Sequence, residues 1–386
     1  MQSDITKEII YIGVDDTDID LFESQYVVPE GISYNSYVIL DEKVTIFDTV
    51  DDRKLDEWCD NLNKALNGAT PEYLVVSHME PDHAAGIARV AEMFPNIQIV
   101  GNAKTFQFMS QFFENVTFNQ YVVKEGDVLS LGKHNLTFVF APMVHWPEVM
   151  LSYESTTKTL FSADAFGKFG IPGTPGGWAC EARRYYYNIV GKYGANVQTL
   201  LKKLAGTEVE YIAPLHGPIL REDLGYYIDM YDKWSRYQAE EDGVLICYAS
   251  IHGNTAKVAE ELKNILAAKG KENVELLDLS RDDMAQAVED AFCNENLVLA
   301  AASYDAGVFP PMADYLHHLK DKNFQNRRVG IIENGTWAPS AARVMRTALE
   351  GMKNINILEP VVTIRSTYKS TDMPALEALA DALINK

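Results

Sequence analysis

The second half of the chain alternates strand-like and helix-like segments regularly, and few folds accommodate this pattern. Apolar runs recur at 244–249, 274–279, 297–302, 329–332 and 361–364. Helical patterns separate these runs at 256–266, 284–291, 312–319 and 341–352. Strands that alternate with helices pair in parallel and are joined by right-handed crossovers. Residues 243–386 are therefore predicted to form one doubly wound α/β domain around a five-stranded parallel sheet.

The first 240 residues are less regular and mix short strand-like runs with helical stretches. Examples of strand-like runs are 44–50, 73–76, 97–100 and 136–140. A helical stretch over 219–237 ends in the acidic segment 238–243, which closes on a glycine and marks a domain boundary. A chain of 386 residues is too long for one ordinary hydrophobic core, so two domains are predicted, 1–240 and 243–386.

Charge and cysteine usage exclude several classes of function. The chain has 34 basic and 55 acidic residues, giving a formal net charge of −21. Such a surface argues against binding to nucleic acid or to anionic membranes. We find no apolar run of transmembrane length and no secretory signal pattern at the N-terminus. The four cysteines contain no C-x-x-C pair, which excludes a rubredoxin-type iron site here and favours reduced thiols in a cytoplasmic protein.

The densest group of ligand-type side chains follows the strand-like run 73–76. The segment Ser77-His78-Met79-Glu80-Pro81-Asp82-His83 places two imidazoles and two carboxylates within six positions. Alternate residues of an extended chain point to one side, so His78, Glu80 and Asp82 are expected to face one way before the chain turns. Carboxylates gathered so closely repel each other unless a cation lies among them. The segment therefore predicts a metal site at a strand end.

Three further segments place single ligand-type residues after strand-like runs. These residues are His145, Asp164 and His216. The chain has eight histidines, and four of them fall in the four segments. Taken singly, each of the three residues is best interpreted as a polar group at a strand end, but the ordered set of four segments favours a shared metal centre.

The order and spacing of these residues resemble the metallo-β-lactamase fold, whose motif is H-x-H/E-x-D-H followed by H, D and H. The resemblance covers most of residues 1–240 and implies an αββα sandwich. Hydrolytic members usually carry histidine at the third motif position, where this chain has Glu80. Four imidazoles and three carboxylates, with Asp164 able to bridge two metals, suit a redox di-iron pair better than zinc.

A second candidate site follows the first strand of the C-terminal domain. The run 244–249 leads into Ser250-Ile251-His252-Gly253-Asn254-Thr255 and then into a helix. Backbone N–H groups at such a turn, together with the helix N-terminus, hold a phosphate. The loop matches neither the P-loop pattern G-x-x-x-x-G-K-[ST] nor the dinucleotide pattern G-x-G-x-x-G. A single phosphate site without lysine fits FMN.

Two more loops follow strands at the same predicted sheet edge. They are Ala302-Ser303-Tyr304-Asp305-Ala306-Gly307 and Asn334-Gly335-Thr336-Trp337-Ala338. Ligands of doubly wound sheets bind beyond the carboxyl ends of the strands. Tyr304 and Trp337 are expected to flank a flat ring. The three loops resemble flavodoxin, although Thr336 stands where related proteins often have glycine and 300–302 is Ala-Ala-Ala in place of a more usual Gly-Ser-Pro.

A metallo-β-lactamase-like domain carrying H-x-E-x-D-H, followed by a flavodoxin-like domain, resembles the flavodiiron protein family over nearly the whole chain. The resemblance implies that one iron is held by His78, Glu80 and His145. It implies that the other is held by Asp82, His83 and His216, and that Asp164 bridges the two. Members reduce O2 to water, or NO to N2O, with electrons delivered through FMN. The implied cofactors are FMN and two non-haem iron ions per chain.

The resemblance also implies partners. Family members pair head-to-tail as homodimers, and a dimer of dimers is a further arrangement. No rubredoxin or NADH-binding module is fused to this sequence, so rubredoxin, a reduced deazaflavin or a flavin reductase is expected to supply electrons. We expect O2 reduction as the main activity, with NO reduction as the alternative.

Two other classes of function stay open on the sequence. A zinc hydrolase of the metallo-β-lactamase fold with an appended flavodoxin domain predicts zinc and no flavin-linked turnover. A flavodoxin-type electron carrier with a scaffold domain predicts FMN and no metal. Glu80 and the flavin loops count against the hydrolase, and the seven ligand-type residues count against the carrier.

Overall fold

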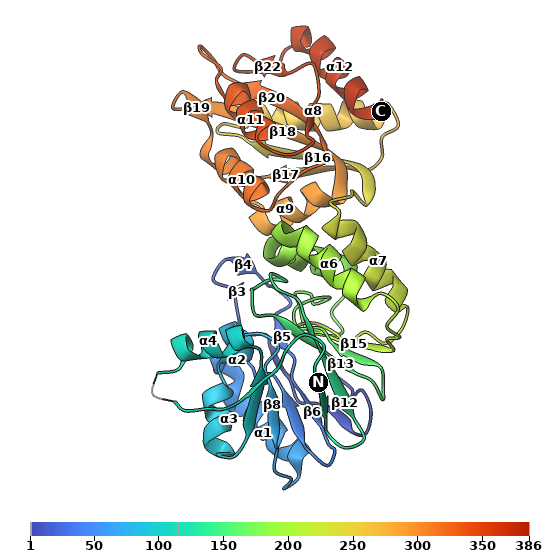
Figure 1. The fold of residues 1–386 in the computed structure, drawn as a ribbon. Coiled ribbons are helices and arrows are strands. Elements are labelled where there is room, and N and C mark those ends of the chain that lie inside the picture. Colours follow the sequence, from blue (N-terminus) through green and yellow to red (C-terminus); the bar gives the residue numbers. More distant parts are fainter. Residues whose placement is uncertain (1, 115, 386) are drawn as a thin grey trace. The chain divides into compact units, whose positions relative to one another are not determined.

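The chain divides into two compact units, Met1–Ser235 and Arg236–Lys386, and each is described by itself. The computed structural model describes residues 2–114 and 116–385. Helix α7 (Leu224–Ser235) closes the first unit, and β16 (Glu241–Ala249) is the first strand of the second (Figure 1). The acidic segment that the sequence marks as a boundary runs directly into β16.

The first unit contains two sheets that pack face to face (Figure 1). The first sheet has the strand order β1 (Ile9–Tyr11), β6 (Tyr37–Ile39), β7 (Thr45–Phe47), β8 (Tyr73–Val75), β9 (Gln98–Gly101), β10 (Asn119–Val122). Strands β7 to β10 are parallel. Their crossovers contain α1 (Leu55–Leu66), the short α2 (Pro81–Ala84), α3 (Ile87–Met93) and α4 (Ala103–Phe112). Helix α1 is amphipathic and buries Trp58, Leu62 and Leu66.

The second sheet is mostly antiparallel and carries the remaining ligand-type residues at its loops. Its strand order is β11 (Val128–Ser130), β12 (Asn135–Phe140), β13 (Met150–Glu154), β14 (Thr159–Phe161), β15 (Tyr211–Ala213). Strands β14 and β15 are parallel, and α5 (Ala179–Tyr185) and α6 (Gly194–Leu204) lie in their crossover. Two small ribbons pair β2 (Val14–Asp16) with β5 (Ile32–Tyr34) and β3 (Leu21–Phe22) with β4 (Tyr26–Val27).

The apolar faces of the two sheets meet in one core. Phe47 of β7 stacks on Phe161 of β14, with ring centroids 4.0 Å apart and planes inclined by 14°. The surrounding cluster draws buried residues from both sheets, including Val75 and Phe138. Each fully buried aromatic of this kind contributes roughly 1.5–3 kcal/mol through removal from water. The arrangement is the αββα sandwich that the resemblance to the metallo-β-lactamase fold implies.

The second unit is the predicted doubly wound domain. Its sheet runs in the order β17 (Val274–Asp278), β16, β18 (Asn294–Tyr304), β20 (Arg328–Asn334), with β21 (Asn356–Ile357) and β22 (Val362–Ile364) beside the two ends of β20. These strands are all parallel. The short β19 (Gly307–Val308) folds back antiparallel on β18. Both faces of the sheet are covered, which explains the continuous apolar runs in the sequence.

Helices cover the two faces of this sheet. Helices α8 (Asn254–Ala268) and α12 (Met373–Ile384) pack on one face, where Ile246, Val298 and Ile332 join their core cluster. Helices α9 (Met284–Cys293), α10 (Pro310–Asp321) and α11 (Ala341–Glu350) belong to the other face. The strand and helix patterns of residues 244–352 all correspond to elements, whereas α12 and the short strands β19 and β21 have no counterpart among the predicted segments.

The predicted helix over 219–237 begins later than expected. Leu220 instead exchanges two backbone hydrogen bonds with Ile212, at 2.9 and 3.0 Å, and so extends the edge of the second sheet. Asp223 then adopts φ of +51°, a left-handed conformation that α-helices exclude. Helix α7 therefore starts at Leu224, and the expectation for residues 219–223 was wrong.

Within the part of the chain that the structure describes, we find no helix with the length and apolar character needed to cross a membrane.

Candidate functional site

The turn after β8 carries four of the seven predicted ligands. Its start is fixed because the backbone N–H of Ser77 donates to Asp48 Oδ1 at 2.6 Å. His78 is fully buried, and Glu80 precedes Pro81, which begins α2. Proline is favoured in the first turn of a helix because it has no N–H to satisfy. The expected alternation therefore holds for His78 and Glu80, whereas Asp82 lies on the helix.

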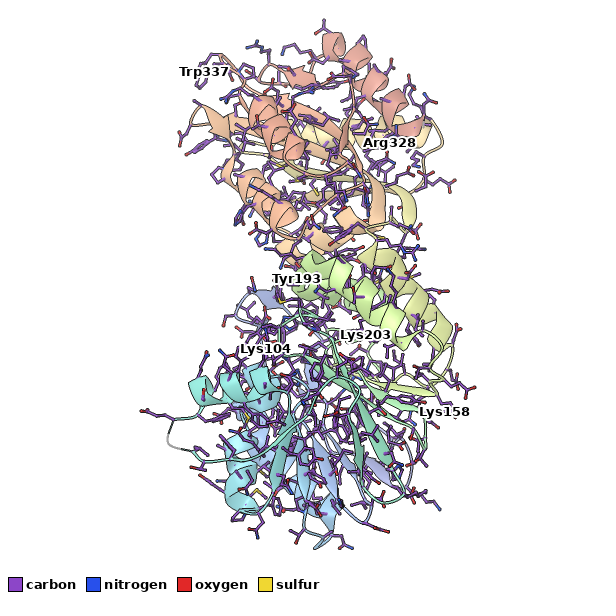
Figure 2. All side chains as sticks on the ribbon, viewed as in Figure 1. Lys104, Lys158, Tyr193, Lys203, Arg328 and Trp337 are labelled. Carbon is purple, nitrogen blue, oxygen red and sulfur yellow. The ribbon has the colours of Figure 1, made fainter. Side chains whose placement is uncertain are left out.

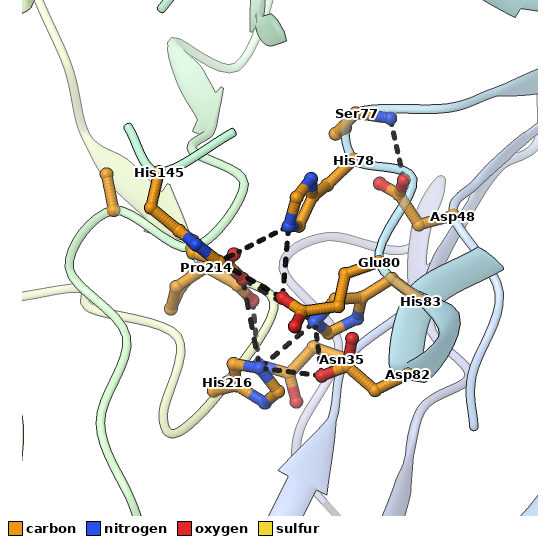
Figure 3. Close-up of polar contacts among 12 residues, drawn as sticks. Asn35, Asp48, Ser77, His78, Glu80, Asp82, His83, His145, Pro214 and His216 are labelled. Carbon is orange, nitrogen blue, oxygen red and sulfur yellow. Dashed lines mark hydrogen bonds and ion pairs between the residues drawn. The ribbon is translucent and has the colours of Figure 1, made fainter. Parts of the chain in front are cut away.

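One group of ligand-type atoms gathers around His78. Its members are His78, Glu80, His145 and Asp164, and we call them the His78 group. Glu80 Oε2 lies 3.2 Å from His78 Nε2 and 3.1 Å from His145 Nε2. Asp164 Oδ2 lies 3.4 Å and 3.1 Å from the same two nitrogens. Figure 3 shows His78 and Glu80, from the turn after β8, together with His145 from another loop.

A second group lies beside the first. It consists of Asp82, His83 and His216, which we call the His216 group. Asp82 Oδ2 lies 3.1 Å from His83 Nε2 and 3.2 Å from His216 Nε2, and all three residues are buried. The two imidazole nitrogens are themselves 3.0 Å apart (Figure 3).

Asp164 faces both groups with different oxygens. Its Oδ2 points to the His78 group, while its Oδ1 lies 3.5 Å from His83 Nε2 and 3.8 Å from His216 Nε2. The carboxylate is fully buried, on the turn that follows β14. A carboxylate placed in this way has the geometry to bridge two cations.

The residues fit a pair of metal ions. Both carboxylate oxygens of Asp82 and of Asp164 are buried without a hydrogen bond. Buried carboxylates are costly unless a cation compensates them. Ligand bonds of about 2.1 Å in tetrahedral geometry would separate donor atoms by about 3.4 Å, close to the spacings within each group. The structure thus brings all seven predicted ligands together.

The charges of the two groups stabilise one another. Burial opposes the cationic form of His83, but Asp82 and Asp164 outweigh this effect and raise its pKa to about 10. Burial likewise opposes protonation of His145, and Asp164 and Glu80 raise its pKa to about 9. Despite burial, the neighbouring imidazoles hold the pKa of Asp82 and of Asp164 below the ordinary aspartate value. Without metal, His83 and His145 would therefore be protonated at neutral pH.

Several contributing residues were missed by sequence reasoning. Glu148 is buried, and its Oε1 lies 2.7 Å from His78 Nδ1. The carbonyl oxygen of Ser33 lies 2.8 Å from His216 Nδ1. Glu23, on the turn between β3 and β4, has its pKa raised to about 7 by burial and by the negative charge of Glu80. Glu23 and Ser33 lie far from the ligands in sequence. Glu148 follows His145 by three residues but lies 70 residues from the His78 that it contacts, so no local spacing identifies that contact.

Aromatic side chains form much of the surrounding wall. Trp146 packs edge-on against His78, with ring centroids 5.2 Å apart, and Tyr185 lies 5.5 Å from His216. Burial raises the pKa of Tyr185, and the negative charge of Asp164 raises it further, so this phenol stays protonated. Tyr26 donates its hydroxyl to the carbonyl of Asn188 at 3.1 Å, which fixes it in the packing. Apolar walls of this kind strengthen electrostatic interactions inside a site.

The second unit has a cavity of about 670 Å³ at the carboxyl ends of β16, β18 and β20. Thirteen of the fourteen residues predicted to bind a cofactor line it, Gly253 being the exception. Gly253 instead sits at the N-cap of α8 with φ of +81°, and no side chain caps this helix. Helix α8 therefore offers uncapped N–H groups to an anion, and the buried Ser250 Oγ has no hydrogen-bond partner.

Two of the predicted contacts use their side chains elsewhere. Ser303 Oγ accepts hydrogen bonds from the backbone N–H groups of Ser340, at 2.8 Å, and Ala341, at 3.2 Å, and so caps α11. The amide of Asn334 exchanges hydrogen bonds with the backbone of Ser366, at 2.9 and 3.1 Å. Both residues line the cavity while their polar groups hold its loops together.

The expected aromatic flanks and one basic residue line the cavity. Trp337 is 88% exposed and projects from the edge of the unit (Figure 2), and Tyr304 is 45% exposed. Arg343 of α11 and Ser366 also line the cavity and were not predicted. An apolar, partly open cavity with an anion-binding end suits a flat ring joined to a phosphate.

Comparison with known proteins identifies relatives of both units. Residues 32–217 match the family model described as ODP family beta lactamase. The nitric oxide reductase of Moorella thermoacetica is 29% identical over 383 residues, covering 96% of this chain and 94% of that protein. The anaerobic nitric oxide reductase flavorubredoxin of Klebsiella pneumoniae is 26% identical over 90% of this chain and 74% of its own length.

Solved structures share the whole fold. The rubredoxin oxygen:oxidoreductase of Desulfovibrio gigas superposes with a TM-score of 0.93 at 26% identity, covering 99% of this chain and 98% of that one. The flavodiiron protein of Giardia intestinalis gives a TM-score of 0.91 at 24% identity, over 99% and 96% of the two chains. The order of both units is therefore shared with these proteins from end to end.

Proposed function

This chain belongs to the flavodiiron protein family, and on that premise we propose that it is an oxidoreductase that reduces O2 to water, with NO reduction to N2O as its second activity. The observation that carries the proposal is Asp164, whose two oxygens face two separate groups of imidazoles and carboxylates. A hydrolase needs a metal-bound nucleophile, whereas a pair with mixed nitrogen and oxygen ligands and a shared carboxylate suits iron.

We assign the seven ligands as the family resemblance implies. His78, Glu80 and His145 would hold one iron, Asp82, His83 and His216 would hold the other, and Asp164 would contribute one oxygen to each. Residues 1–240 would form the di-iron domain and residues 243–386 the FMN domain. The Ser250–Thr255 loop holds the FMN phosphate, while 302–305 and 334–337 enclose the ring.

The iron pair, FMN and the protein side chains would have different roles in the reaction. When bound, the iron pair would supply the redox centre for the gas, and FMN would supply electrons one at a time. Reduction of O2 consumes four electrons and four protons and gives two waters; reduction of two NO consumes two of each and gives N2O and one water. The chain's residues hold the metals, and Trp146 and Tyr185 wall the site against bulk water.

Metal and flavin analysis tests this proposal. Reconstituted protein is expected to hold two irons and one FMN per chain. Zinc without flavin-linked turnover would instead support a hydrolase, and FMN without metal would support an electron carrier. Neither alternative is favoured by the relatives, which are named as reductases and oxidoreductases.

The preference between the two gases needs a direct comparison. The fully reduced protein should be mixed anaerobically with O2 or with NO in a stopped-flow instrument. We expect faster oxidation by O2, and a much faster reaction with NO would make NO reduction the main activity. The relatives support both, since their names include nitric oxide reductase and rubredoxin oxygen:oxidoreductase.

Electrons would come from a separate donor: rubredoxin, a reduced deazaflavin or a flavin reductase. The acidic composition, with a net charge of −21, makes docking of an acidic protein sensitive to salt. Reduction rates that do not change with ionic strength would indicate a small-molecule donor. We further propose a head-to-tail homodimer, or a dimer of such dimers, in the cytoplasm. Sedimentation of the holoprotein tests the assembly.

A further inference from the structure

Glu148 connects the two loops that carry His78 and His145. Its side chain is 1% exposed, and Oε1 accepts a hydrogen bond from the backbone N–H of Met79 at 2.9 Å. The same oxygen lies 2.7 Å from His78 Nδ1. Because the motif turn and the His145 loop come from different sheets, this carboxylate is a direct tie between them.

The main chain around Glu148 is fixed as well. Asn102, the N-cap of α4, donates its Nδ2–H to the carbonyl of Glu148 at 2.6 Å. Two residues on, the backbone N–H of Met150 donates to the carbonyl of Ser77 at 3.0 Å. A side chain held at both ends of its segment has little freedom to leave His78.

The second oxygen of Glu148 shows that this contact is electrostatically important. Oε2 is buried and has no hydrogen-bond partner. An ionised carboxylate in such a place is compensated chiefly by the imidazole it faces and by whatever cation that imidazole binds. An Nδ1–H donated to a carboxylate also leaves Nε2 as the free ligand atom and makes it more basic.

Among the described residues, no carboxylate outside the ligand set hydrogen-bonds the Nδ1 of His83 or of His216, although the buried Asp48 interacts electrostatically with His83. His216 Nδ1 meets the neutral carbonyl of Ser33 at 2.8 Å, and His83 Nδ1 is buried without a hydrogen bond in the described structure. In their ligand types the two groups match, since each has two imidazoles, one carboxylate of its own and a share of Asp164. A carboxylate in direct contact with a ligand imidazole is therefore a chemical difference between them.

We propose that Glu148 is a positioning residue that makes the two metal positions unequal, giving the His78 group the higher affinity for iron. The inference rests on the proposed di-iron function and assigns a property within it. By adding negative charge behind His78, Glu148 also favours the ferric state of the metal held there. The two irons are thus expected to load in sequence, and the His78 position to fill first.

The test is an anaerobic titration of metal-free protein with Fe(II), in which calorimetry measures the binding. Wild type is expected to bind one equivalent tightly and a second more weakly. In Glu148→Gln the tight equivalent should weaken by about 10–100-fold, the range for loss of an outer partner, while the other changes little. Anomalous diffraction at one iron per chain should show the His78 position filled in wild type and no longer preferred in the variant. The potential of the iron pair should also rise while that of FMN does not.

Glu154→Gln is the matched control. Glu154 is likewise a fully buried carboxylate beside a buried imidazole, with Oε1 3.2 Å from His134 Nδ1, but it lies at the opposite end of β13 from Met150. A merely structural role for Glu148 predicts similar losses of stability in both variants and unchanged iron binding. Only Glu148→Gln should lower the affinity for the first, tightly bound iron.

The possible outcomes distinguish a wrong role for Glu148 from a wrong di-iron function. If Glu148→Gln weakens both equivalents equally, or neither, the assignment of Glu148 is wrong. If Glu148→Gln does not fold, Glu148→Asp replaces it, because the shorter side chain keeps the charge but loses contact with His78. If Glu148→Asp binds the first iron as tightly as wild type does, the assignment is also wrong. Wild-type protein that fails to bind two irons would instead refute the proposed function.

Discussion

The Nε2 atoms of His83 and His216 face each other at 3.0 Å inside the first unit. Two imidazole nitrogens at this distance share a proton or a cation, because two bare lone pairs repel. Asp82 lies against both nitrogens, at 3.1 and 3.2 Å, and adds the negative charge that either occupant requires. Protons and metal therefore compete for the same buried place.

Removing the metals is expected to make the first unit lose stability as pH rises. Burial opposes the charged imidazoles, but the surrounding carboxylates raise the pKa of His83 to about 10 and of His145 to about 9. Unfolded histidine titrates near pH 6.5. The stabilisation is therefore complete below about pH 6.5 and is lost as pH rises through 9 to 10. Thermal unfolding of chelated and iron-loaded protein between pH 6 and 10 checks this, and a chelated midpoint that stays flat would contradict it.

Asp164→Asn is expected to empty both metal positions. The substitution removes the charge that both groups share, so iron affinity should fall by more than the roughly 10–100-fold typical of losing an outer partner. Iron per chain, measured after gel filtration, should drop from two to below one. Ser162→Ala is the control, because Ser162 Oγ donates to the carbonyl of Ala165 at 2.7 Å in the same turn. That variant should lose about 1 kcal/mol of stability and keep its iron.

Glu80→His is expected to shift metal selection towards zinc. Replacing the carboxylate by imidazole gives the nitrogen-rich set that zinc prefers, and it removes a contact from both His78 and His145. Protein produced with equal iron and zinc in the medium should show a higher zinc-to-iron ratio than wild type. An unchanged ratio would mean that Glu80 does not select the metal.

Ser250→Ala is expected to weaken FMN binding. The hydroxyl is buried without a partner beside the uncapped start of α8, where a phosphate would accept its hydrogen bond. A hydrogen bond to a charged group contributes about 1.5–3 kcal/mol, so Kd should rise roughly 10–100-fold. Quenching of FMN fluorescence on binding measures this change.

Ser303→Ala, in the same cavity, is expected to affect stability more than FMN binding. Its hydroxyl caps α11, so the variant should lose about 1 kcal/mol of stability in the second unit while FMN affinity changes far less than in Ser250→Ala. Thermal unfolding and FMN titration of both variants provide the comparison. Equal losses of FMN affinity would show that Ser303 also contacts the phosphate or ring.

Local patterns explain how far sequence reasoning reached. The strands and helices from 244 to 352 follow periodicities that a few neighbouring residues establish, and the turn at 77–83 is dense enough in ligand types to predict a metal site. The wrong prediction for residues 219–223 has a different cause. These residues look helical, but Leu220 pairs with Ile212 of strand β15. Helix propensity could not anticipate that partner.

The sequence by itself determined the strand and helix order of the second domain, the ligand-rich turn at 77–83 and the three loops at one sheet edge, because these depend on periodicity and short spacing. The grouping of His145, Asp164 and His216 with that turn followed from the family resemblance. Only the tertiary structure decided that Asp164 offers one oxygen to each group, that Glu148 stands behind His78, and that Ser303 caps a helix. Glu148 and His78 are 70 residues apart, and the packing of two sheets brings them within 2.7 Å. Such contacts arise from the packing of distant segments, which no local pattern specifies.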